Sequence, residues 1–144
     1  MGKLVKIDKD MDFDVIKFAN NKYALDDGTI LRISCIVGKV LKHSGKDEFG
    51  NPNYLVNTRN FVVAIIKPEF RGAPSSEGYD PIKDTFEHVD FMTINEPWNE
   101  YKLVDGRMLK VKLVLAQVVR YEKRNNMGEP VYRIKSQVNV SAGY

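Results

Sequence analysis

The sequence predicts an all-β fold: an internally duplicated β-barrel or sandwich of two four-stranded units, related by a pseudo-twofold axis and containing little helix. Two observations lead to this prediction. The chain repeats itself at an offset of 78 residues, and both copies consist of β-rich segments separated by turns that contain glycine or proline.

The repeat is clearest between residues 23–34, YALDDGTILRIS, and residues 101–112, YKLVDGRMLKVK. Without any gap, 15 of the 54 positions from 11 to 64 are identical to the residue 78 positions later. We interpret this as an internal duplication, with a first β unit at residues 5–66 and a second at residues 83–143. The segment between them, residues 67–82, is rich in Pro, Gly and Ser; we call it the strap and expect it to be exposed.

The first unit is predicted to begin with a half-buried strand, because apolar and acidic residues alternate around residues 7–15. An Asp-Gly pair then marks a tight turn, at residues 27–28 and again at 105–106. The segments that follow, residues 29–42 and 107–120, are rich in β-branched side chains and too long for a flat strand.

Gly38 and Ala116 occupy matching places in those long segments, where a bend or bulge lets a strand turn a corner. A Gly-x-Pro loop and a closing strand complete each unit. Four strands in about 60 residues are marginal alone, so we expect the two units to share one core; two separate small barrels are the alternative.

Composition limits the class of protein. The chain has 144 residues, a net charge of +3 and a single cysteine, Cys35, which excludes an internal disulfide and favours a cytoplasmic location. No apolar run approaches the roughly 20 residues that span a bilayer, so no membrane association is expected.

No pattern for catalysis or cofactor binding is present in the sequence. His43 and His88 lack the partner ligands that zinc requires, and there is no glycine-rich phosphate loop. The position of Cys35 matches Leu113, which indicates a small buried side chain rather than a nucleophile. Matched residues such as Tyr54 and Tyr132 are interpreted as holding the fold. We therefore expect no metal, no cofactor and no enzymatic activity.

The two units differ in charge. Residues 107–135 carry eight basic and two acidic side chains, a net +6, whereas the matching residues 29–57 carry a net +2. Such a concentration of positive charge indicates an anionic partner. The candidate nucleic-acid-binding residues are Lys110, Lys112, Arg120, Lys123, Arg124, Arg133 and Lys135.

We expect Arg120 to lie across from Arg133, and five of these side chains to project from one face if no bulge breaks the alternation. The first functional hypothesis is a small β module that binds single-stranded DNA or RNA, since no recognition helix is visible. The alternatives are a structural or assembly protein, forming homo-oligomers or docking in a larger complex, and an enzyme of unknown chemistry.

Overall fold

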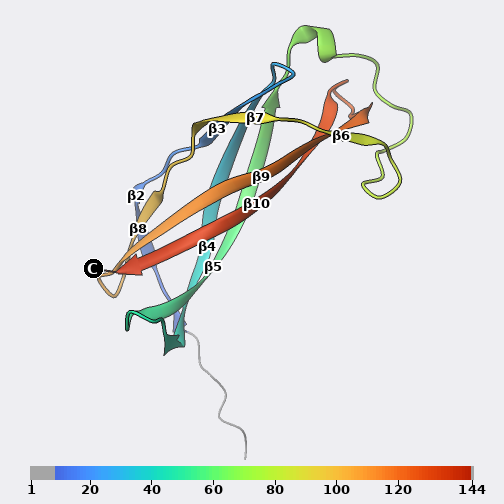
Figure 1. The fold of residues 1–144 in the computed structure, drawn as a ribbon. Coiled ribbons are helices and arrows are strands. Elements are labelled where there is room, and N and C mark those ends of the chain that lie inside the picture. Colours follow the sequence, from blue (N-terminus) through green and yellow to red (C-terminus); the bar gives the residue numbers. More distant parts are fainter. Residues whose placement is uncertain (1–8, 144) are drawn as a thin grey trace, which may run out of the picture.

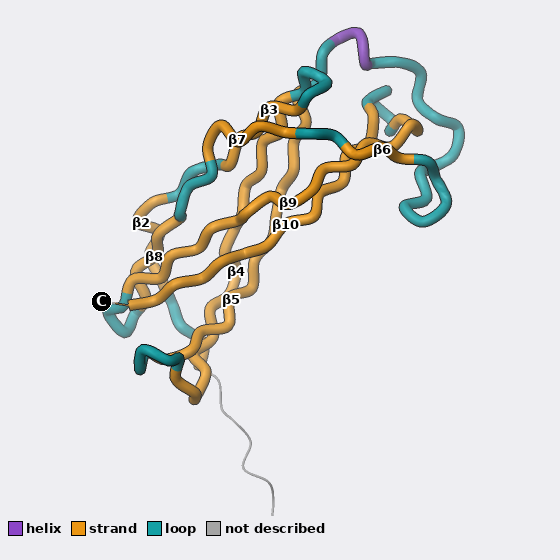
Figure 2. The backbone as a smooth tube through the Cα atoms, in the orientation of Figure 1, coloured by secondary structure: helices purple, strands orange, loops and turns teal. Residues whose placement is uncertain are grey.

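The computed structural model describes residues 9–143, and within this range the chain is almost entirely β (Figures 1 and 2). One short 3-10 helix, η1 (Pro68–Phe70), is the helical element of the described residues. The strands are β1 (Lys9–Asp10), β2 (Phe13–Lys17), β3 (Asn21–Leu25), β4 (Ile30–Lys46), β5 (Pro52–Ile65), β6 (Phe86–His88), β7 (Phe91–Asn95), β8 (Asn99–Leu103), β9 (Met108–Arg124) and β10 (Pro130–Gly143).

The strands form two antiparallel sheets of five strands each. In the first sheet β4 pairs with β5 along one edge and with β3 and β1 along the other, and β7 lies beyond β3. In the second sheet β9 pairs with β10 on one side and with β8 and β6 on the other, and β2 lies beyond β8. Each sheet therefore contains one strand from the opposite half of the chain.

The barrel, one of the two predicted alternatives, is wrong, and so is the grouping of strands into two units. The barrel is not closed, because within residues 9–143 β5 and β10 each pair along a single edge and no ladder joins the two sheets. Self-contained four-stranded units are not formed either, because β2 and β7 are exchanged between the halves. The predicted start of the first unit, at residue 5, lies outside the described residues.

The strand bounds recur at the 78-residue offset. β4 and β9 are both 17 residues long, and β5 and β10 are both 14 residues long. The predicted tight turns are confirmed: Gly28 and Gly106 adopt φ values of 87° and 89°, in the left-handed region that favours glycine. The predicted bulges are also confirmed, because the pairing of β4 with β5 skips Gly38 and that of β9 with β10 skips Ala116.

One hydrophobic core lies between the sheets and draws on both halves of the chain. Its most buried side chains, with 0% exposure, are Tyr23, Leu31, Ile33, Leu109 and Val111. The exchanged strands each add a ring to it: Phe91 of β7 packs edge-on against Tyr23 at 5.6 Å, and Phe13 of β2 packs edge-on against Tyr101 at 5.5 Å. Cys35 is buried in this core, as expected of a small apolar side chain.

The strap crosses one end of the molecule, from the end of β5 towards β6 (Figure 1). None of its residues is buried. It is nevertheless hydrogen-bonded to the turn between β9 and β10, where the amide of Gly72 donates to the carbonyl of Gly128 at 2.9 Å. After the strap, a turn closed by a hydrogen bond from the amide of Asp84 to the carbonyl of Asp80 leads into β6.

Candidate nucleic-acid interface

The bulge at Ala116 decides which way the predicted basic side chains point. Before it, the odd-numbered residues of β9 from Leu109 to Leu115 are buried; after it, the buried core position is the even-numbered Val118. Lys110 and Lys112 therefore lie on the outer face of the second sheet, whereas Arg120 lies on its inner side.

The predicted register is off by one residue. Arg120 pairs with Tyr132, and Arg133 pairs with Val119, because a further irregularity follows Pro130. The expectation that Arg120 lies across from Arg133 is therefore wrong, and the two do not share a face. The sequence can indicate that a bulge is possible, but it does not show which of the two paired strands contains the extra residue. The register beyond the bulge therefore could not be predicted.

Arg120 is bound within the chain. Its guanidinium donates to the Asp27 carboxylate at 2.8 Å and to Glu87, and it lies 5.9 Å from the centre of the Phe70 ring. The hydroxyl of Tyr132 donates to the same Asp27 oxygen at 2.7 Å. Burial opposes ionisation of Asp27, but the hydrogen bonds from Tyr132, Thr29 and Arg120 outweigh it and lower the pKa of the carboxyl.

A matching cluster lies at the 78-residue offset, around Asp105. The hydroxyl of Tyr54 donates to Asp105 at 2.6 Å, and Lys42 and Arg107 each approach the same carboxylate at 3.3 Å. Burial and the adjacent Asp105 raise the pKa of Tyr54 to about 12. In each cluster the Asp-Gly turn of one half is joined to the long hairpin of the other half, which makes these matched residues part of the fold.

Lys123 and Arg124 are also occupied, by the strap and by Asp84, which follows it. The Lys123 ammonium lies 3.1 Å from Asp84 and 3.9 Å from Glu77. The Arg124 side chain donates to the carbonyl of Phe70 at 3.2 Å, and its amide donates to the hydroxyl of Ser75 at 2.9 Å. These two cations therefore fasten the strap to the end of the β9–β10 hairpin.

Four of the seven predicted residues remain on the outer face of the second sheet: Lys110, Lys112, Arg133 and Lys135. The Lys110 ammonium lies 4.0 Å from a carboxylate oxygen of Glu100. The Lys112 ammonium lies 5.7 Å from the centre of the Trp98 ring, a cation–π contact with a partly exposed aromatic side chain. Arg133 and Lys135 are exposed, and they form no ion pair with any described residue.

Aromatic side chains on the second sheet are divided between core and surface. Tyr121 is buried between the rings of Tyr79 and Phe86, at 5.1 and 5.4 Å, and it donates to the carbonyl of Pro81. It is thus unavailable for stacking on a base. Trp98 was missed in the sequence, because its proximity to Lys112 depends on the pairing of Asn99 with Val111.

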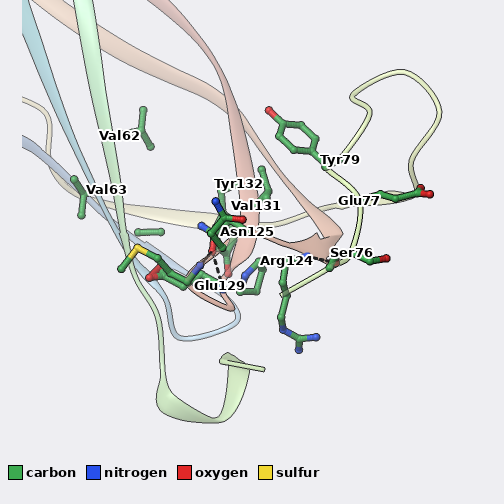
Figure 3. A pocket seen from close by; sticks show the side chains of 16 residues that line it. Val62, Val63, Ser76, Glu77, Tyr79, Arg124, Asn125, Glu129, Val131 and Tyr132 are labelled. Atoms are coloured by element: carbon green, nitrogen blue, oxygen red, sulfur yellow. Dashed lines mark hydrogen bonds between the residues drawn. The ribbon is translucent and has the colours of Figure 1, made fainter. Parts of the chain in front are cut away.

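A groove of about 710 Å³ lies elsewhere, between the C-terminal part of β5, the β9–β10 turn and the strap (Figure 3). Val62 and Val63 border it on one side, and Arg124, Asn125 and Glu129 lie on the other. Sequence reasoning missed this groove as well, since it joins three segments that are remote in the chain.

Other kinds of site find little support in residues 9–143. No group of three or more His, Cys, Asp or Glu side chains in this range is placed to hold a metal ion. No helix in the same range is long and apolar enough to cross a membrane. Comparison of the chain with known protein families, with curated proteins and with solved structures finds no match.

Proposed function

We propose that this chain is a non-enzymatic β module that binds single-stranded DNA or RNA on the outer face of its second sheet. The observation that carries the proposal is the outward projection of Lys110, Lys112, Arg133 and Lys135 from two adjacent strands. Gln137 and Asn139 continue this face as exposed or half-buried polar side chains. The cations of such a sheet face can bind successive phosphates of a nucleic-acid strand. Trp98 adds one aromatic surface on which a base can stack.

The proposal is limited to a flexible, single-stranded ligand. No α-helix is present in residues 9–143 to enter a major groove, and the four cations supply contacts to phosphates rather than to base edges. Binding should therefore be weakly dependent on sequence and strongly dependent on salt.

The test is a titration of fluorescent single-stranded DNA and RNA at several salt concentrations. Four phosphate contacts give a slope of about −3 in log affinity against log salt, and reversing Arg133 and Lys135 to Glu should reduce it to about −1.4. The matched control reverses Lys22 and Arg32, a cross-strand pair of exposed cations on the outer face of the first sheet, and should leave the slope unchanged. Absence of binding by the unaltered protein at low salt contradicts the proposal.

A second candidate function is assembly, with copies of the same chain or within a larger complex. It is favoured by the outward side chains of β5, where Leu55, Phe61, Val63 and Ile65 are between 48% and 60% exposed. Large apolar side chains gathered on one exposed strand are typical of an interaction surface.

We also infer that the two halves arose by duplication, that residues 5–66 and 83–143 are the repeat units around one shared core, and that the protein is cytoplasmic. The recurring strand bounds and the two Asp–Tyr clusters support the duplication. Superposition of an experimental structure of one half on the other tests it, and a different strand order in the two halves contradicts it.

A further inference from the structure

The free edge of β5 is long. β5 pairs with β4 from Pro52 to Ile65, and among residues 9–143 it has no ladder partner along its other edge. An unpaired edge of 14 residues presents a row of amide and carbonyl groups that another strand can match. Edge strands in soluble proteins are usually protected against such pairing by charged residues, prolines or bulges.

β5 has less of this protection than β10. The outward row of β5 reads Leu55, Asn57, Arg59, Phe61, Val63 and Ile65. At the same 78-residue offset the outward row of β10 reads Arg133, Lys135, Gln137, Asn139, Ser141 and Gly143. Arg59 is the single charged residue of β5. Two strands with the same place in the fold thus carry opposite kinds of surface.

The apolar surface extends from β5 across the first sheet. Ile36 of β4, which pairs with Arg59, is 40% exposed, and Met92 of β7 is 69% exposed. The free edge of β5 and the adjoining outer face of the first sheet are therefore both apolar. A strand that added to this edge would bury both its own side chains and those of β5.

We propose that β5 pairs, edge to edge and antiparallel, with β5 of a second copy of this chain. The strand complements itself when the twofold axis passes through Asn60. Leu55 then lies opposite Ile65 of the partner subunit, and Asn57 lies opposite Val63 of the partner subunit. Arg59 lies opposite Phe61 of the partner subunit, so no like charges face each other and the central cation lies against an aromatic ring.

The alternative occupants of the edge fit less well. If β10 of another copy added to β5, its Arg133 and Lys135 would join an apolar row, and the head-to-tail contact would not close. An acidic partner would meet a single cation, Arg59. Pairing of β5 with itself is isologous and closes after two subunits.

The edge is also open at its C-terminal end. The groove of about 710 Å³ runs beside Val62, Val63 and Ala64, between β5 and the β9–β10 turn (Figure 3). In the proposed register Val56, Thr58 and Asn57 of the partner subunit enter this groove. Its walls include the exposed Met127 and the half-buried Val131, which offer them apolar contacts.

This inference deepens the assembly candidate and is independent of nucleic-acid binding. The test is sedimentation equilibrium of the full chain over a wide concentration range. Phe61→Lys combined with Val63→Lys should weaken dimerisation about 100-fold or more, because both side chains lie at the proposed contact. The matched control, Asn139→Lys with Ser141→Lys, places the same lysines on β10 and should leave the dimer intact. Circular dichroism should show all variants folded, since each altered side chain is exposed or half-buried.

A cysteine pair tests the register. In a Cys35→Val background, Asn60→Cys should form an intersubunit disulfide on mild oxidation, because residues opposite each other in an antiparallel ladder have Cα atoms about 4.5–5.5 Å apart. Thr58→Cys should not, because two such residues would be about 13 Å apart along the paired strands. A monomer at all concentrations overturns the inference. A dimer that survives the lysine variants, or that is cross-linked through Thr58→Cys and not Asn60→Cys, overturns the β5 register while leaving an assembly function standing.

Discussion

Replacing Asp27 with Ala should destabilise the protein by about 3 kcal/mol, although the residue lies in a turn. The Asp27 side chain is 7% exposed and accepts hydrogen bonds from Tyr132 at 2.7 Å, from Arg120 at 2.8 Å and from the amide of Thr29 at 2.9 Å. A hydrogen bond to a charged group contributes roughly 1.5–3 kcal/mol, and the three share one carboxylate and do not add fully. Arg120 keeps Glu87, which reduces the cost of leaving its guanidinium unpaired.

Tyr132→Phe removes a smaller part of the same cluster. It deletes the bond to Asp27 and leaves the buried hydroxyl of Thr29 without its 3.0 Å contact, at a cost of about 2 kcal/mol. In the double variant the two losses should overlap, with a coupling free energy of about 1.5 kcal/mol. The matched pair is Asp105 and Tyr54, where the carboxylate is 16% exposed and its cations are more distant, at 3.3 Å. Asp105→Ala should therefore cost about 1 kcal/mol less than Asp27→Ala.

The assay is urea unfolding at pH 7, followed by circular dichroism, of Asp27→Ala, Tyr132→Phe, Asp105→Ala and Tyr54→Phe and of the double variant within each cluster. A constant slope against urea in all of them would show that the variants differ in stability and not in the extent of unfolding. A cost below about 1 kcal/mol for Asp27→Ala, or a coupling free energy near zero between Asp27 and Tyr132, would refute the reasoning. The apolar core and the ladders of the exchanged strands β2 and β7 would then hold the two halves together without a contribution from these clusters.

Three further predictions follow from the same contacts. Because the pKa of Asp27 is lowered on folding, its stabilising contribution is present above about pH 4 and is lost as the pH falls; Asp27→Asn should flatten acid denaturation followed by fluorescence, and an unchanged acid limb contradicts this. The pKa values of Tyr54 and Tyr132 are raised to about 12 by burial and by the carboxylates, so stability should fall between about pH 10 and 12, and less steeply when both are Phe. Gly128→Ala should expose the strap to limited proteolysis, since an added Cβ would lie 2.1 Å from the carbonyl oxygen of Gly72; Gly50→Ala has a similar φ and open space around it, so equal cleavage in both variants would contradict a role for this contact.

The local features of the fold could be predicted from the sequence because they depend on local chemistry. Gly28 and Gly106 mark turns through their backbone freedom, and the β-branched runs before Gly38 and Ala116 mark strands that must bend. The pairing of strands could not be predicted in the same way. The predicted half-buried alternation is not seen in β2, where Phe13 is partly buried and the other four residues are exposed. β2 pairs with β8, and Phe13 packs against Tyr101, a contact between residues 88 positions apart.

The basic face was half predictable for a related reason. Lys110 and Lys112 precede the bulge and alternate with apolar residues of β9 that are buried. Their outward direction therefore follows from the two-residue repeat of a strand. Arg120 lies beyond the bulge, where one extra residue reverses the parity and turns the side chain towards Asp27, 93 positions away. Lys123 and Arg124 are bound by Asp84 and by the strap, and no local pattern in the sequence indicates the course of this segment over the hairpin.

The difference between β5 and β10 has a consequence for how the protein associates. The fold offers two edges in matching positions, and if both were apolar each copy could bind two others and chains could grow without limit. In the proposed dimer, Arg133, Lys135 and the polar residues that follow them on β10 would keep one of these edges out of self-association. Introducing Leu at Arg133 and Phe at Asn139, the side chains found at Leu55 and Phe61, should therefore convert a closed dimer into larger species in light scattering. If this variant keeps the size of the unaltered protein, the polar character of β10 does not limit assembly, and its cations serve another purpose, of which the binding of an anionic strand is the one that their outward direction favours.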